Sequence, residues 1–443
     1  MTRAQDNWPI VEAQEKTGAP WKKYRTRRVA DLPGYSPKNV PVCPYGGRSD
    51  LRGKATGFFR TEKANGRWWL VDPDGHPFIY RGVSDWMPGR SETSKSALTS
   101  KYGSEEGWAN GSVRELRDAG FVGACFWSKP GAAERSNPKL VRAQVLNWMA
   151  DYGRHRGGAY QQTGHTGFPQ DCIFVFDPEF KEFCQTKAEE LRASRDDPWV
   201  LGYYSDNELP FPFNALDRFL QLGSDSAGFN EAQRWLNTRK GRAANAGDIA
   251  TADRQEFLKF LAERYFQICA EAIRAQDPHH LYLGCRFYGP DLGTPQLFEA
   301  AGKYVDVLSV NWYGTWTPDN RPILWEKWSG KPVLITEWYV KGEDSGLGNT
   351  TGAGWTVRTQ ADRGLFYQNF TLGLLQNRVC VGWDWFKYMD NDPEDPSADP
   401  SNRDANKGVV SNRYVPYSRL LESMRLLNGQ VYSIADQFDA ASK

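Results

Sequence analysis

The sequence predicts an α/β protein, a (β/α)8 barrel with an N-terminal arm and a β-hairpin. Three observations favour this fold. Short apolar runs alternate with longer amphipathic stretches, as in parallel strands joined by helices. Several of the runs are apolar throughout, which is typical of strands buried on both faces. The length of 443 residues suits one such barrel with added loops. We expect an arm over residues 1–52 and the barrel, including the hairpin, over 53–443.

The N-terminal part begins with the polar arm, in which Trp21 to Arg28 is basic. We interpret this stretch as a solvated surface rather than a binding patch. The stretch from Gly57 to Val83 alternates strand-like and turn-like residues around Asp74-Gly75, a strong hairpin signal. This pattern predicts a β-hairpin that closes the barrel floor, followed by a first barrel strand at 78–83.

The remaining elements follow from apolar periodicity and from residues that start or stop helices. Ser112, Glu115 and Gly120 have the spacing of an N-cap, a capping box and a C-cap, and they predict a helix at 112–120. We expect further strands at 121–127, 144–149, 199–204, 281–287, 305–311, 333–335 and 379–385. We expect further helices at 180–191, 231–237, 255–276, 361–375 and 417–427, and long rim loops at 152–172 and 210–250.

Composition excludes several classes of protein. The net charge of +1 argues against a nucleic-acid-binding surface. No apolar run reaches the 18 or more residues of a membrane span, so we expect no membrane segment. The N-terminus lacks the apolar core of a signal peptide, so the protein is either cytoplasmic or has lost a leader. Aromatic residues make up 14% of the chain, with 18 tryptophans, and flat rings suit a carbohydrate ligand.

Cysteine and histidine usage does not predict a metal centre. The seven cysteines are widely spaced and contain no C-x-x-C pair, so buried free thiols are favoured over a disulfide framework. The five histidines show no spacing typical of zinc ligands. We therefore expect neither a metal nor a cofactor.

Two carboxylates at strand ends form the candidate catalytic pair. Glu337 follows the apolar run Val333 to Ile335, and Asn207-Glu208 follows the strand expected at 199–204. In a parallel barrel the carboxyl ends of the strands converge on one rim, where catalytic side chains collect. Glycosidic bond hydrolysis needs one acid and one carboxylate that attacks or activates water. Asn207 is placed to hydrogen-bond a sugar hydroxyl beside the scissile bond.

These motifs resemble those of retaining glycoside hydrolases of clan A, and the chain is similar to the β-agarases of glycoside hydrolase family 50. Beyond Asn207-Glu208 and Thr336-Glu337-Trp338, the likeness lies in RWWLVDPDGHPF at 67–78, Ala119-Gly-Phe through Trp127-Ser, FDPEF at 176–180, IRAQDPHHLYLGCRF at 273–287 and VGWDWFKYMD at 381–390. It extends from about Gly57 to the C-terminal helix.

The resemblance implies cleavage of β-linked galactose units in a red-algal galactan such as agarose, porphyran or carrageenan. It implies Glu208 as acid/base, Glu337 as nucleophile and Tyr313 as the tyrosine that orients the nucleophile. It also implies a periplasmic or extracellular location and an oligo- or polysaccharide partner. Such a mechanism requires the pKa of Glu208 to be raised and Glu337 to stay ionised.

Further rim residues are candidate substrate contacts. We expect Trp383 or Trp385 to form the platform beneath the sugar at the cleavage point. Additional stacking candidates are Trp86, Trp127, Trp312, Trp316 and Trp338, although strand alternation sends about half of any such set away from the ligand. Arg286 and Lys387 are candidates for binding a sulfate or carboxylate, and the alternative for each is an ion pair within the rim.

Two alternative functions stay open at this point. The enzyme class allows another β-linked glycan, such as a β-galactoside or a β-mannan. A different class, a non-catalytic carbohydrate-binding barrel, would bind sugar without turnover. No Gly-rich phosphate loop is present, which disfavours a nucleotide enzyme. Endo or exo action and the oligomeric state are not predicted.

Overall fold

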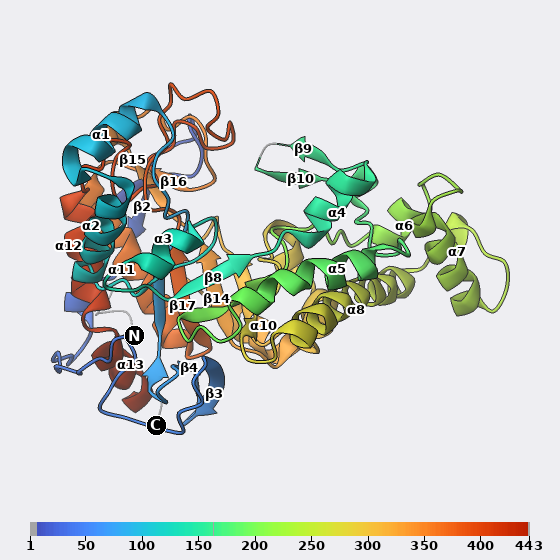
Figure 1. Ribbon diagram of the computed structural model, residues 1–443, viewed down its shortest axis with the longest axis horizontal. Helices are drawn as coiled ribbons and strands as arrows, with labels where there is room; N and C mark the ends of the chain where they lie inside the picture. Colours follow the sequence, from blue (N-terminus) through green and yellow to red (C-terminus); the bar gives the residue numbers. More distant parts are fainter. Residues whose placement is uncertain (1–6, 163, 442–443) are drawn as a thin grey trace.

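Eight short parallel strands separated by helices form the centre of the structure, a computed structural model that describes residues 7–162 and 164–441 (Figure 1). Their hydrogen bonds give a five-stranded sheet in the order β13-β14-β17-β6-β7 and a three-stranded sheet in the order β12-β11-β8. The strands are β6 Tyr80–Val83, β7 Gly123–Ala124, β8 Arg142–Val145, β11 Val200–Tyr204, β12 Leu281–Tyr282, β13 Leu308–Asn311, β14 Val333–Glu337 and β17 Cys380–Trp385. The α/β class predicted from the sequence is confirmed.

Single bridges connect the two sheets at both of their edges. Gly123 of β7 bridges Val141, directly before β8, and Phe287, shortly after β12, bridges Val310 of β13, both in the parallel sense. Among these eight strands, those that lie side by side also follow one another along the chain. The exception is β17, the last of the eight, which lies beside β6, the first.

The strands are buried on both faces, as their apolar composition predicts. In β14, Val333 and Ile335 pack in the large core shared with the helices, whereas Leu334 packs in a second cluster with Leu201, Leu283 and Val381. Fully burying one such side chain stabilises the fold by roughly 1.5–3 kcal/mol. The alternation leaves each strand little choice of register, because a one-residue slip would exchange the two faces.

The helices cover the outer side of the strands. They are α1 Glu92–Tyr102, α2 Glu105–Asp118, α3 Pro130–Arg135, α4 Trp148–Arg156, α5 Phe180–Ala188, α6 Ala215–Phe219, α7 Ala227–Lys240, α8 Thr251–Gln276, α9 Pro295–Gly302, α10 Arg321–Ser329, α11 Gln360–Asn377, α12 Ser418–Asn428 and α13 Val431–Ala440. Short 3-10 helices occupy Val29–Asp31, Pro169–Asp171, Glu189–Ala193, Ala246–Asp248, Gly289–Gly293 and Glu343–Ser345. No helix among the described residues is long and apolar enough to cross a bilayer.

The helix predicted at 112–120 begins about two turns earlier than expected. Its N-cap is Ser104, whose hydroxyl accepts a hydrogen bond from the Gly107 N–H at 3.0 Å. Ser112 is instead buried inside α2 and accepts the Trp86 indole N–H at 3.0 Å. The predicted start was wrong because Ser112 and Glu115 have the spacing of a capping box inside the helix, and Ser104 is the actual cap. A Cβ at Gly107 would lie 2.0 Å from the Tyr102 carbonyl oxygen, so close packing requires glycine there.

The segment after the second strand also differs from the prediction. The strand expected at 144–149 is β8, which ends at Val145, and α4 begins at Trp148. The expected loop at 152–172 contains the end of α4 and an antiparallel hairpin, β9 Tyr160–Gln162 and β10 His165–Gly167. In the expected loop at 210–250, α7 is twice as long as the predicted short helix.

The N-terminal segment contributes strands that the sequence did not reveal. β1 Ile10–Gln14 pairs with β2 Lys22–Arg25 and with β16 Trp355–Val357, which itself pairs with β15 Val340–Gly342. β15 follows directly on the end of β14 (Figure 1). The hairpin predicted around Asp74-Gly75 is confirmed as β4 Arg67–Val71 and β5 Pro77–Phe78, and β3 Arg60–Ala64 pairs with β4 as a third strand.

Candidate active site

Glu208 and Glu337 lie close together at the carboxyl ends of their strands. Glu337 is the last residue of β14, and Glu208 follows β11 with a left-handed backbone, φ +51°. The Asn311 side-chain N–H2 donates to Glu208 Oε1 at 2.7 Å and to Glu337 Oε2 at 3.1 Å. One nitrogen contacts both carboxyl groups. The distance between Glu208 Oε1 and Glu337 Oε2 is therefore no greater than the sum of these two hydrogen-bond lengths.

The surroundings of Glu337 favour a carboxylate held in one orientation. The Tyr313 hydroxyl donates to Oε1 at 2.8 Å, and the Arg286 guanidinium donates to Oε2 at 2.7 Å. The Asn311 amide oxygen accepts the Thr336 hydroxyl at 2.8 Å, which orients its N–H2 group toward the two glutamates. Charge-assisted hydrogen bonds of this kind are roughly twice as strong as neutral ones.

The surroundings of Glu208, in contrast, favour the protonated form of its carboxyl group. Burial, and after it the negative charge of Glu337, raises the pKa of Glu208 to about 8, although the Asn311 hydrogen bond and the Arg286 charge oppose this rise. Desolvation and a nearby like charge both disfavour the ionised form of a carboxyl group. The geometry therefore supports one protonated and one ionised carboxyl group side by side.

Arg286 is a buried residue of the rim and does not face solvent. Its guanidinium donates to Glu337 and, at 2.8 Å, to the side-chain oxygen of Asn207, and it lies 3.4 Å from the centre of the Phe126 ring. It is fully buried. The expected contact between Arg286 and a substrate anion is corrected to the alternative, an ion pair within the rim. The hydrogen bond from Arg286 to Oδ1 also holds the Asn207 side chain in place.

A cavity of about 310 Å³ lies between the segments that follow β6, β7 and β17. Trp127 lines it and is 40% exposed, next to the Phe126 ring that contacts Arg286. Lys387 also lines it, and its ammonium pairs with Asp85 and donates to Asn391 at 2.7 Å. Contact between Lys387 and a sulfate or carboxylate of the substrate stays a prediction. The ammonium charge of Lys387 is already paired with the carboxylate of Asp85.

The other predicted stacking residues are not available to a ligand. Trp86, Trp312, Trp316, Trp338, Trp383 and Trp385 are buried. The Trp338 ring stacks on Phe370 at 4.3 Å, and the Trp383 and Trp385 indoles donate to the Tyr367 hydroxyl and the Lys407 carbonyl. Their stacking role is corrected, because all six rings pack in the large apolar core.

Two residues of the site were missed from the sequence. Asn311 ends β13, so the rule that selected Glu337 would also have found it. His165 lies in the β9–β10 hairpin, and its Nδ1 atom is 3.9 Å from Glu208 Oε2. Its Nε2 atom is 3.3 Å from the Tyr288 hydroxyl, and burial lowers the pKa of His165 from its usual value. No signal in the sequence places this hairpin over the rim.

Two carboxyl groups that face each other at the ends of parallel strands are typical of glycoside hydrolases. The chain is 33% identical to BpGH50, whose crystal structure it matches with a TM-score of 0.86 over 97% of this chain and 96% of that one. The chain belongs to glycoside hydrolase family 50. A solved exo-beta-agarase, 21% identical, shares the fold with a TM-score of 0.72 over 92% of this chain and 70% of its own.

Curated relatives agree with this assignment. Beta-agarase B of Vibrio sp. (strain JT0107) is 27% identical over 96% of this chain and 53% of its own length. Beta-agarase A of the same strain is 26% identical over 87% of this chain and 47% of its own length. The chain thus spans about half the length of the curated relatives it matches. No protein-family model matches the chain.

Proposed function

We propose that the protein is a retaining glycoside hydrolase that cleaves β-linked galactose units of a red-algal galactan by double displacement. The observation that carries this proposal is the Asn311 amide, which contacts Glu208 and Glu337 at once. It limits their separation to a value near the roughly 5–5.5 Å of retaining enzymes and below the roughly 6.5–9.5 Å that leaves room for a water in inverting ones. The names of the agarase relatives support the substrate class.

In the first step, Glu337 attacks the anomeric carbon while the bond to the leaving oxygen breaks. Glu208 gives its proton to that oxygen, and a glycosyl ester with Glu337 results. Tyr313 and Arg286 hold the attacking carboxylate, and the Asn207 side-chain nitrogen donates to a neighbouring sugar hydroxyl. In the second step, the Glu208 carboxylate takes a proton from a water that attacks the same carbon and releases Glu337. The exposed ring of Trp127 provides a stacking surface in the adjacent cavity.

The eight parallel strands support a closed (β/α)8 barrel as the finer description of the fold. The bridges Gly123 to Val141 and Phe287 to Val310 connect the two sheets at both edges, and the strands enclose a separate apolar cluster. We propose that residues 1–52 form an arm and that residues 53–443 form the catalytic barrel. A galactan polymer meets an enzyme outside the cell, so we propose a periplasmic or extracellular location.

The charges around the cavity favour a neutral galactan as the substrate. Aspartates outnumber cations in its wall, with Asp85, Asp390, Asp392, Asp395 and Asp399 against Arg90, Lys387 and Lys407. An acidic wall disfavours sulfate groups, so agarose should be cleaved with a higher kcat/KM than carrageenan. Added salt should screen the repulsion and reduce this difference. Turnover of carrageenan equal to that of agarose at low salt would contradict this preference.

The test of the function is reducing-end release from agarose, porphyran, carrageenan and mannan oligosaccharides. Glu208→Gln and Glu337→Gln should each lower kcat by roughly 10²–10⁴-fold or more. Glu343→Gln, which removes only an ion pair with Arg358, is the matched control and should retain activity. NMR of the first product should show the β-anomer if the configuration is retained.

Other outcomes would redirect the proposal. Turnover of mannan alone would keep the mechanism and remove the galactan. Sugar binding by a folded protein without any turnover would overturn catalysis and leave a carbohydrate-binding protein. An initial α-anomer would overturn the double displacement.

A further inference from the structure

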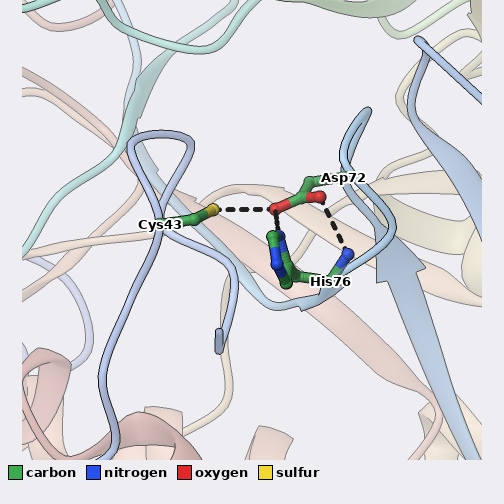
Figure 2. Close-up of side chains that lie close together, drawn as sticks. All are labelled: Cys43, Asp72 and His76. Carbon is green, nitrogen blue, oxygen red and sulfur yellow. Dashed lines mark hydrogen bonds and ion pairs between the residues drawn. The ribbon is translucent and has the colours of Figure 1, made fainter. Parts of the chain in front are cut away.

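Three potential metal ligands lie together far from the catalytic carboxylates. Cys43, Asp72 and His76 each offer one ligand atom, and these atoms all lie within 4.8 Å of one another (Figure 2). Asp72 and His76 belong to the turn between β4 and β5, which precedes the amino end of β6. The catalytic glutamates lie at the opposite, carboxyl ends of the parallel strands. Cys43 comes from the arm, in the loop at 41–48.

The spacing of these atoms suits one small cation. The Cys43 Sγ atom is 2.9 Å from Asp72 Oδ2, and the His76 Nδ1 atom is 3.3 Å from the same oxygen. Zinc bonds of about 2.0–2.3 Å in a tetrahedral arrangement place donor atoms roughly 3–4 Å apart. Two of the three separations therefore already lie near this range, and the third, between the thiol and the imidazole ligand atoms, is at most 4.8 Å.

The surrounding backbone holds the ligands in position. The second Asp72 oxygen, Oδ1, accepts the backbone N–H of His76 at 2.9 Å (Figure 2). It also accepts the backbone N–H of Asp74 at 3.0 Å. These two bonds turn Oδ2 toward the thiol. The Cys43 N–H donates to the Gly47 carbonyl at 2.9 Å. A Cβ at Gly47 would lie 2.4 Å from Asp72 Oδ2, so only glycine lets this loop approach. Such support of the ligands is typical of metal sites.

The charge of Asp72 is the second observation that points to a cation. Asp72 is fully buried, and the salt bridges of the described residues pair it with His76 and with no lysine or arginine. A buried carboxylate without a cation carries a large desolvation penalty. A divalent ion would compensate this charge more fully than the hydrogen bonds of Asp72 with the Cys43 thiol and the His76 ring.

We propose that Cys43, Asp72 and His76 bind one zinc ion, which joins the arm to the β4–β5 turn. Thiolate, imidazole and carboxylate ligands together favour zinc over magnesium or calcium, which prefer oxygen. On binding, the Cys43 thiol releases its proton to solvent, and the thiolate, the neutral His76 Nδ1 and Asp72 Oδ2 each donate an electron pair. Cys43 is partly exposed, so water completes the fourth position. The role is structural, because the ion lies away from the catalytic pair.

Metal titration of the full chain tests the site. Protein stripped with a chelator and desalted is titrated with zinc chloride, and with cobalt chloride as a spectroscopic probe. We expect one zinc per chain, a thiolate-to-cobalt charge-transfer band, and a Tm rise of about 2 °C or more at zinc 100-fold above Kd. Magnesium should have no effect on Tm. Activity on the galactan should be unchanged by the chelator.

Two conservative variants and two matched controls assign the ligands. Cys43→Ser and His76→Gln should each weaken zinc binding by roughly 100-fold and abolish the Tm rise. Cys172→Ser and His155→Gln, which change a cysteine and a histidine outside the cluster, should bind as the wild type does. Circular dichroism checks that each variant is folded. Zinc binding that is equal in all variants, or absent from the wild type, would overturn the proposal without bearing on the glycosidase function.

Discussion

At the residue scale, Asn311 is the group that couples the two glutamates. It lowers the pKa of Glu208 through its hydrogen bond, while burial and the charge of Glu337 raise it to about 8 overall. A general acid works while it is protonated, so the rate should fall as the pH rises through this pKa. We expect the alkaline limb of kcat/KM against pH in the wild type near pH 8. A limb in this range that persists unchanged in Glu208→Gln would contradict the assignment.

Replacing Asn311 should change both the rate and this limb. Asn311→Ala removes the donor to both carboxyl groups, so kcat should fall by roughly 10²-fold. The loss of the hydrogen bond raises the pKa of Glu208 further, so the alkaline limb should move to higher pH. Asn214→Ala is the control, because its side chain accepts only from Arg218. An unchanged limb combined with reduced activity would indicate a structural effect only.

At the scale of single elements, two serine hydroxyls of α2 should differ in how much they stabilise the fold. Ser104 caps the helix, whereas Ser112 is buried within it. Ser104→Ala removes the N-cap hydrogen bond and should lower the free energy of unfolding by about 1 kcal/mol. Ser112→Ala leaves the buried Trp86 indole N–H without its acceptor and should cost about 1–3 kcal/mol. Urea unfolding monitored by circular dichroism measures both changes. A neutral Ser104→Ala together with a costly Ser112→Ala would mean that the helix frays at its start.

The helices and strands that the sequence predicted well share one property. The helix α8 and the strands β11 and β14 are buried over much of their length, so their apolar periodicity reflects packing directly. Among the elements missed, β1, β9, β10 and α13 are short or close to a chain end. The strand β1 depends on a partner distant in the sequence, with Val357 opposite Ala13, and no local pattern reveals such a partner.

At the scale of the whole molecule, the arm is part of the rim. The Val11 side chain is fully buried, whereas the neighbouring Ile10 is 57% exposed. The Tyr24 ring stacks on Trp316 at 4.9 Å, and the Trp316 indole donates to the Thr26 hydroxyl at 3.1 Å. The arm therefore buries Trp316, one of the additional stacking candidates.

A matched pair of variants tests this packing. Val11→Ala should lower the free energy of unfolding by about 2 kcal/mol, because it leaves a cavity in a closed core. Ile10→Ala should change it by less than about 0.5 kcal/mol, since the side chain faces solvent. Equal effects of the two substitutions in urea unfolding would mean that the arm is not packed as described.

The sequence by itself determined the α/β class, the order of the central strands, the two glutamates and the likeness to family 50. These follow from local patterns, since a strand buried on both faces is apolar and a rim residue directly follows it. Only the tertiary structure decided which of the candidate tryptophans are exposed, that Arg286 holds Glu337, and that Asn311 joins the carboxyl groups. It also brought Cys43 beside Asp72 and His76. Contacts of this kind join residues far apart in the chain, and the packing of the whole molecule sets them.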